Sequence, residues 1–558
     1  FGDGLEQDTR LVTNWPGIAL MEGPANRLRD SLFALLKACD SRGLLKQGFS
    51  ALRGDPEKVY QQGLNLLPAA MLLDYGNPIW VERLMESARH LERISGLNSA
   101  GHRHLRSYLL SATDVIEEGY HAREDVHSAL LWHPALALAW YNRNPRVLRW
   151  LTETADALLA HWEKDRYLKL SLGIRFFSDD VISRGLPEPE RMNLLWGMFR
   201  LTGDRKYLRA AETGEGRNEF GLLDALNQGG ELGLAETIGG RWMEFLENAE
   251  LYRKAVLGLV GERNIWDRNL QGDESGLLAR QHAFELTGSK RYVEDYQAAL
   301  LKHFSQNRVM YTEAEPYAGH VEIPQKALQR ARLGGVAYHH SMLYPGHSVS
   351  WEGTDGKLAA LVLKANASFI KLTVFNFSKS LLDVTLRIWD LENGTYSVVE
   401  GTDVTGNDRI DVETTRRTLP LRRGSAIPLS LRAQKTTVIE ITPVTKGIAL
   451  GELPDLAMAM EELKYDPITD KGSLVIHNIG AKKSPPFVLQ VENERRVVLL
   501  KKQLEALEAP LDLLPKRMTV ELSGIKVGAS RLLTFKLDPD NQVEEITHDN
   551  NVLRKSLN

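Results

Sequence analysis

Four stretches of the chain repeat one pattern, in which an apolar helix is followed by a tight turn and a second, amphipathic helix. The stretches are Asn65–Leu91, His133–Leu159, Asn193–Glu212 and Gly276–Leu300. The predicted turns fall near Asn77, Asn144, Gly203 and Gly288. Gly and Asn tolerate the left-handed backbone that ends a helix. Units of this kind bury their apolar faces only by stacking on one another, so the repeat predicts a stacked helical architecture.

The two helices of each unit differ in character. The first is apolar nearly all round, as in LLPAAMLL, whereas the second carries charge on one face, as in VERLMESARHLER. A helix that is apolar all round is buried, and an amphipathic helix lies on the outside. Inner and outer helices in alternation predict an incomplete (α/α) toroid over residues 1–315, with a linear solenoid as the structural alternative.

The hydrophobic pattern changes to period two from about Gly346 onward. Segments such as LAALVLKANASFIKLTVFNFS alternate apolar and polar residues, and turn signals such as Asn393–Gly394 separate them. This pattern predicts an antiparallel β-sandwich with its linker over residues 316–446, and a second, immunoglobulin-like sandwich over residues 453–558. The expected fold class is therefore multidomain α+β.

Composition excludes several classes of function. The 558 residues carry a formal net charge of −4, which argues against a nucleic-acid-binding protein. No apolar run is long enough for a membrane span. The single cysteine, Cys39, allows no intrachain disulfide, and we expect it to be a small buried residue.

Candidate catalytic residues gather in the long connection from Ser95 to Trp132, which runs directly into His133. A ring of helical hairpins places its long connections on one face, where functional residues concentrate. Histidine, tyrosine and arginine together suit proton abstraction beside a carboxylate. We expect His133 or His121 to be the base and Tyr120 or Tyr60 the acid. The predicted substrate-binding residues are Asn65, His102, His104, Arg106, Arg123, Trp132, Arg191 and Asn193.

Other interpretations of these residues stay open. A single histidine here is more often structural, and His102-x-His104 resembles half of a metal site to which spacing adds no third ligand. We therefore predict no metal and no cofactor. A toroid glycoside hydrolase would need paired carboxylates, drawn from Glu117, Glu118, Asp179, Asp180 and Asp273. A non-catalytic glycan-binding surface protein is the third alternative.

Two segments resemble known families. The hairpins LTGDRKYLRAA and LTGSKRYVEDY are similar to those of (α/α)-toroid polysaccharide lyases and glycoside hydrolases. This resemblance implies eliminative cleavage of a uronate-containing polysaccharide or oligosaccharide. The unit from Pro454-Asp455-Leu456 through VIHNIGAKKSPPF to Asn550-Asn551 resembles the CARDB modules of bacterial cell-surface proteins. It implies a protein that is secreted, periplasmic or associated with the cell surface.

Overall fold

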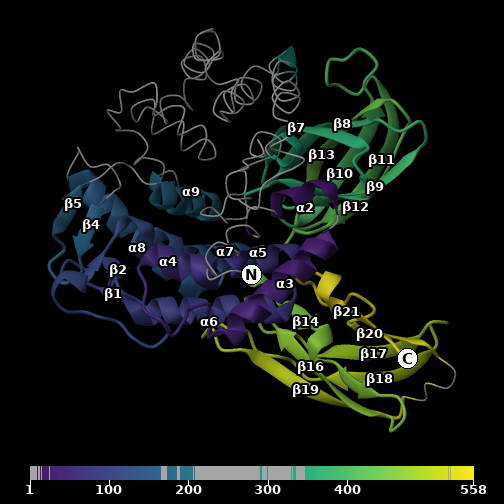
Figure 1. The fold of residues 1–558 in the computed structure, drawn as a ribbon. Helices are drawn as coiled ribbons and strands as arrows, with labels where there is room; N and C mark the ends of the chain where they lie inside the picture. The colour runs from purple at the N-terminus through teal and green to yellow at the C-terminus, as the bar shows by residue number, and fades with distance from the viewer. Residues whose placement is uncertain are drawn as a thin grey trace, which may run out of the picture.

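The computed structural model describes most of residues 16–164, 172–184, 189–207, 346–525 and 530–557, with a few single residues between these ranges. The N-terminal part is mainly helical, and the C-terminal half consists of antiparallel sheets (Figure 1). In the described part of the chain, no helix has the length and apolar character of a membrane span.

Two of the predicted helical hairpins are described in full, and both are confirmed. The first pairs α5 (Leu66–Leu73) with α6 (Pro78–Ile94), and the second pairs α7 (His133–Asn142) with α8 (Pro145–Lys164). Each outer helix begins at a proline after a capping asparagine. The side-chain oxygen of Asn77 accepts from the backbone N–H of Ile79 at 2.9 Å, and Asn144 accepts from Arg146 at 3.0 Å.

The turns lie where they were predicted, and in each one the left-handed residue stands one position before the asparagine. These left-handed residues are Gly76, with φ of 84°, and Arg143, with φ of 58°. The asparagines are needed as N-caps, because their short side chains satisfy N–H groups that the first helical turn leaves unpaired. The backbone reversal therefore falls on the preceding residue.

Burial follows the predicted contrast between inner and outer helices. All ten residues of α7 are buried, as are the first seven residues of α5, whereas α6 and α8 each expose part of their surface. The further helices are α2 (Pro16–Glu22), α3 (Ala25–Ser41), α4 (Pro56–Val59), η1 (Tyr60–Leu64) and α9 (Pro189–Thr202). Of the third predicted hairpin, the first helix (α9) and the turn at Gly203 are described, whereas most of its second helix and most of the fourth hairpin lie outside the described residues, so the toroid stays a prediction.

The long connection between α6 and α7 contains short elements of its own. Strands β1 (Ser95–Leu97) and β2 (Arg103–Leu105) form a hairpin, and β3 (Arg123–Glu124) pairs with β4 (Leu172–Arg175). Strand β5 (Val181–Arg184) completes the small sheet. Two 3₁₀ turns complete the connection, η2 (Gly119–His121) and η3 (Val126–Trp132). This end of the helical region lies away from the large sheets (Figure 1).

The first group of long strands forms two antiparallel sheets. Five strands follow the order β11-β10-β13-β8-β7, and three follow the order β12-β9-β6. The strands of the larger sheet are β7 (Leu358–Asn366), β8 (Phe369–Asn376), β10 (Gly394–Thr402), β11 (Val412–Leu421) and β13 (Thr436–Lys446). Those of the smaller sheet are β6 (Val349–Glu352), β9 (Leu382–Ile388) and β12 (Ala426–Leu431). The predicted strands are thus present.

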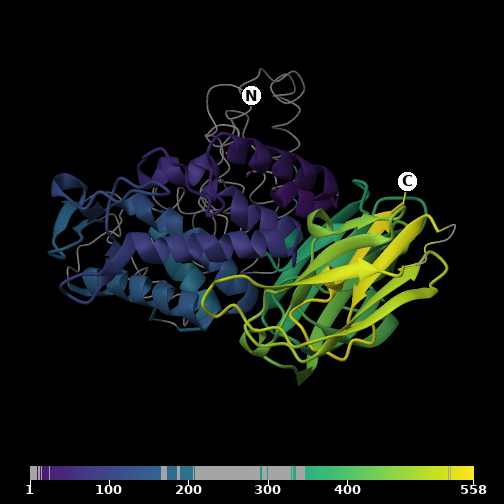
Figure 2. The ribbon, with the colours of Figure 1, turned by 90° about the horizontal axis from the view of Figure 1, so that it is seen from below.

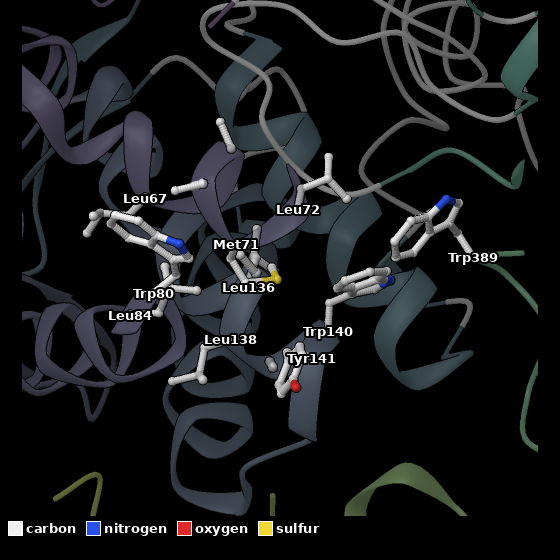
Figure 3. Close-up of a cluster of buried hydrophobic side chains, with 14 of the residues drawn as sticks. Leu67, Met71, Leu72, Trp80, Leu84, Leu136, Leu138, Trp140, Tyr141 and Trp389 are labelled. Atoms are coloured by element: carbon white, nitrogen blue, oxygen red, sulfur yellow. The ribbon is translucent and has the colours of Figure 1, made fainter. Parts of the chain in front are cut away.

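The inner helices and this first group of sheets share one core. Figure 3 shows its centre, where Met71 of α5 and Leu136 of α7 lie near Trp140. The indole rings of Trp140 and Trp389 lie 6.3 Å apart, and Tyr75 contacts both rings. The guanidinium of Arg423 stacks on Trp140 at 4.0 Å. Trp140 is therefore a core residue, and Cys39 is likewise buried as predicted.

The last group of strands forms a separate pair of antiparallel sheets with its own apolar core. One sheet runs β14-β16-β15 with β19 on β16, and the other runs β18-β17-β20-β21. The first comprises β14 (Leu456–Met458), β15 (Lys464–Asp466), β16 (Lys471–Asn478) and β19 (Lys516–Ser523). The second comprises β17 (Phe487–Asn493), β18 (Val498–Leu504), β20 (Leu532–Leu537) and β21 (Val552–Ser556). No comparison tests the predicted CARDB likeness or the domain boundaries, which stay predictions.

The last pair of sheets lies beside the helical region (Figure 2), and buried polar contacts join the two. The Tyr141 hydroxyl of α7 donates to Asp455, and the Asn142 amide donates to the carbonyl of Ile479 at 2.9 Å. Asn550 also donates to Asp455, at 3.2 Å. Burial raises the pKa of Asp455 to about 7, even though these hydrogen bonds lower it.

This raised pKa predicts how stability changes with pH. Between the ordinary carboxyl pKa of 3.8 and about 7, folded Asp455 holds a proton that the unfolded chain has lost. The protonated Asp455 therefore contributes to the free energy of unfolding at low pH, and this contribution is lost as the pH rises toward 7. The loss is on the order of 4 kcal/mol. We expect Asp455→Asn to remove much of this loss, measured as urea midpoints at about pH 4.5 and pH 8. Equal losses in the variant and the wild type would contradict the assignment. Asp540→Asn, at an exposed position, is the matched control and should follow the wild-type profile.

Candidate active site

The helical run before α5 changes its winding at Tyr60. Asp55 caps α4 by accepting from the backbone N–H of Lys58 at 2.9 Å, and the chain then enters the π-helical turn η1. Gly63 lies inside this turn with φ of 149°, a value at which a residue with Cβ is strained. In this turn the backbone N–H of Asn65 bonds the carbonyl of Tyr60 at 3.0 Å. π turns occur preferentially at functional sites, because they redirect side chains that a regular helix would align.

Tyr60 and His133 form a buried pair at this turn. The Tyr60 hydroxyl and His133 Nδ1 lie 3.2 Å apart, and the two rings meet edge to face at an interplanar angle of 88°. Both side chains are at most 1% exposed. His133 is the first residue of α7, so its position follows from where that inner helix begins. The structure thus brings together one predicted acid and one predicted base.

Unsatisfied polar groups accompany this pair. Asn65 follows η1 directly and is fully buried, yet neither atom of its amide has a hydrogen-bond partner among the described residues. Among the described residues, the indole N–H of Trp132, which directly precedes His133, and the side-chain oxygen of Gln62 also have no hydrogen-bond partner. A buried amide without partners costs about 1–3 kcal/mol, so this group is suited to bind a polar ligand.

The other predicted acid and base, Tyr120 and His121, lie together at a second position, close to Arg123. The guanidinium of Arg123 stacks on the rings of Tyr120, at 3.8 Å, and Tyr108, at 4.8 Å. Tyr120 is 68% exposed, and His121 beside it is half-buried in η2. Arg123 also lies 3.7 Å from the carboxylate of Asp125.

Tyr108 connects the stack to the helix that carries Tyr60. Burial raises the pKa of Tyr108, and the negative charges of Asp55 and Asp125 raise it further. Asp55 is the N-cap of α4, which runs directly into η1. The Arg123 stack therefore lies toward the beginning of α4, and Tyr60 follows the last residue of that helix directly.

Three further residues were predicted to bind the substrate carboxylate, namely Arg106, Arg191 and Asn193. Arg106 forms an ion pair with Glu117, so its charge is already compensated. Arg191 and Asn193 lie in α9, and their side chains are outside the described residues.

His102 and His104 take part in a separate cluster with His161 and Asp179. His102 Nδ1 lies 3.0 Å from one oxygen of Asp179, and His161 Nε2 lies 3.1 Å from the other. Burial lowers the pKa of His161, and the neighbouring His104 lowers it further. Burial alone would raise the pKa of Asp179, but the Asn98 amide and the three histidines hold it below its usual value.

The carboxylates that a hydrolase would need are dispersed. Glu117 is paired with Arg106, Glu118 is exposed, and Asp179 belongs to the histidine cluster. Asp180 accepts from the hydroxyl of Ser178, and Asp273 lies outside the described residues.

Sequence reasoning missed three participants: Gln62, Tyr108 and His161. Gln62 is two residues from Tyr60 in the sequence, but a π turn has no periodicity signal that would show its side-chain oxygen to be buried. His161 lies in the amphipathic helix α8 and had no neighbouring metal or catalytic motif.

Comparison with known proteins leaves the family of this chain open. No family model and no curated protein matches it. One solved structure, that of a GH127 beta-L-arabinofuranosidase from Geobacillus stearothermophilus T6, aligns over 94% of this chain and 89% of its own. The sequence identity is 11% and the TM-score 0.23. Values this low assign neither a fold nor an activity to this chain.

Proposed function

We propose that this chain is a polysaccharide lyase that cleaves a uronate-containing glycan by β-elimination. The observation that supports the proposal is the buried, hydrogen-bonded Tyr60–His133 pair, with the unsatisfied amide of Asn65 on the same helical run. Elimination beside a uronate requires an acid, a base and a group that can bind the carboxylate, and Asn65 is the candidate for the last of these on the helical run that carries Tyr60. An exported protein with a carbohydrate partner is the setting that we propose for this activity.

Asn65 would act on the substrate carboxylate. The C5 proton of a uronate is weakly acidic, because its removal places negative charge on the carboxylate-bearing carbon. An amide N–H donated to that carboxylate stabilises the charge as it develops. Because the Asn65 side chain is buried and makes no competing hydrogen bond within the described residues, its amide is available for this contact.

His133 and Tyr60 would then move the two protons. The lone pair of His133 Nδ1 takes the C5 proton, the C5–H electrons form the C4=C5 double bond, and the C4–O4 bond breaks. The Tyr60 hydroxyl gives its proton to the departing O4. The imidazolium and the phenolate that result face each other across 3.2 Å, so direct proton transfer restores both groups.

The Arg123 stack would hold the sugar chain outside this centre. Tyr120 offers an exposed ring face to a pyranose, and the buried guanidinium of Arg123 supports that ring from behind. We assign Tyr120 and His121 to substrate contact and not to proton transfer, because Tyr120 is exposed and Tyr60 is buried.

Absorbance in the unsaturated-uronate band tests this proposal. The chain is incubated with a panel of uronate polysaccharides, and reducing ends are counted in the same samples. We expect both signals to rise together on one substrate. New reducing ends without absorbance would identify a hydrolase instead, and binding without any new ends would identify a non-catalytic glycan-binding protein.

A further inference from the structure

A cluster outside the proposed active site brings together donor atoms from three separate segments of the chain. His102 precedes β2 and His104 lies within it, His161 belongs to the last part of α8, and Asp179 lies in the turn between β4 and β5. One donor atom from each of these residues lies within 4.8 Å of the other three. Zinc bonds of about 2.0–2.2 Å in a tetrahedron place ligands about 3.3–3.6 Å apart, so small side-chain shifts would enclose one ion.

The arrangement around the neutral ring of His104 suits a bound cation. Its Nδ1 lies 3.3 Å from Oε2 of Glu124, so the proton of the neutral ring belongs on Nδ1. Its Nε2 then carries a lone pair. This atom is fully buried, has no hydrogen-bond partner among the described residues and lies 3.7 Å from Oδ1 of Asp179. Two acceptors facing each other repel, whereas a cation between them would attract both.

The neighbours of the cluster hold it in the geometry of metal ligands. Glu124 is 3% exposed, and its Oε2 also accepts from the backbone N–H of Leu105 at 2.9 Å. A carboxylate behind a histidine fixes the tautomer and orientation that a metal requires. On the opposite side, the Asn98 amide donates to Asp179. The backbone of Asp179 has φ of 62°, an uncommon conformation for a residue other than glycine, and it donates to Arg175 at 3.0 Å.

We propose that His102, His104, His161 and Asp179 bind one zinc-class divalent cation that joins the β1–β2 hairpin, α8 and the β4–β5 turn. Three imidazoles and one carboxylate match the donor preference of Zn²⁺. Four protein ligands leave no position for substrate, which is the pattern of a structural ion. The proposal is independent of the lyase activity.

Metal analysis of the purified full-length chain, with any affinity tag removed, tests the site. We expect about one zinc per chain in the wild type and in His121→Gln, a histidine of the same connection that lies outside the cluster. We expect the zinc to be absent from Asp179→Ala and His161→Ala. Equal zinc content in the wild type and both cluster variants would overturn the assignment.

Cobalt titration of the wild-type chain after removal of its metal avoids dependence on variants that fold poorly. We expect Co²⁺ to give visible absorption of tetrahedral nitrogen and oxygen coordination that saturates at one equivalent and disappears when Zn²⁺ is added. Glu124→Gln should weaken metal affinity roughly 10- to 100-fold while leaving the spectrum unchanged. No absorption on addition of Co²⁺, together with no protection against thermal unfolding by Zn²⁺, would contradict the proposal.

Discussion

Tyr60→Phe is expected to lower kcat on the uronate substrate by about 10²–10⁴-fold, the contribution of one positioned proton donor. The substitution removes only the hydroxyl that faces His133 Nδ1, so the apolar packing of the ring is kept. His133→Gln should cause a loss of similar size, because it removes the proposed base. Initial rates of absorbance increase at saturating substrate measure both effects.

Tyr120→Phe is the matched control for this prediction. It makes the same chemical change at the exposed tyrosine that the sequence ranked equally with Tyr60. We expect a change of only a few-fold, mainly in KM, since the ring still stacks on Arg123. A loss of kcat in Tyr120→Phe as large as in Tyr60→Phe would move the acid to the exposed stack.

Glu82→Ala is expected to destabilise the chain by about 3 kcal/mol, because it leaves a buried positive charge without one of its partners. Glu82 lies on α6 and is 5% exposed. Its carboxylate contacts Nδ1 of His477 at 2.7 Å and also pairs with Arg517. Burial alone would lower the pKa of His477, but its hydrogen bonds with Glu462 and Glu82 raise it, so the ring is favoured as a cation. The midpoint of urea unfolding reports the loss.

Glu86→Ala provides the comparison for Glu82. Glu86 lies one helical turn further along α6 and is only half-buried. We expect it to change stability by about 0.5 kcal/mol or less. If the two variants unfolded at the same urea concentration, the buried ion pairs between α6 and the last pair of sheets would make no net contribution.

Periodicity in the sequence predicted the helices and strands in which each face is either buried or exposed along its whole length. Helix α7 is apolar nearly all round and all ten of its residues are buried, and the alternating residues of the sheets show which face meets a core. His133 could be placed for the same reason, since it begins a helix with a clear apolar pattern. The part of the toroid that lies outside the described residues stays a prediction.

The candidate site could be predicted only in part, because it depends on contacts between distant segments. Tyr60 meets His133 through a π turn, which leaves no periodic signal. Clustering along the sequence favoured Tyr120 and His121, but a cluster in one connection says nothing of which side chains are buried. His102 and Asp179 are 77 positions apart, so spacing could not supply the third and fourth donors of the proposed metal site.

Mass spectrometry of the products from one defined uronate oligosaccharide tests the central proposal most directly. Elimination adds no water, so we expect the masses of the two products to sum to the mass of the substrate, with the unsaturated product one water lighter than its hydrolytic counterpart. Products whose summed mass exceeds the substrate by one water would show hydrolysis, and would contradict a mechanism based on Tyr60, His133 and Asn65.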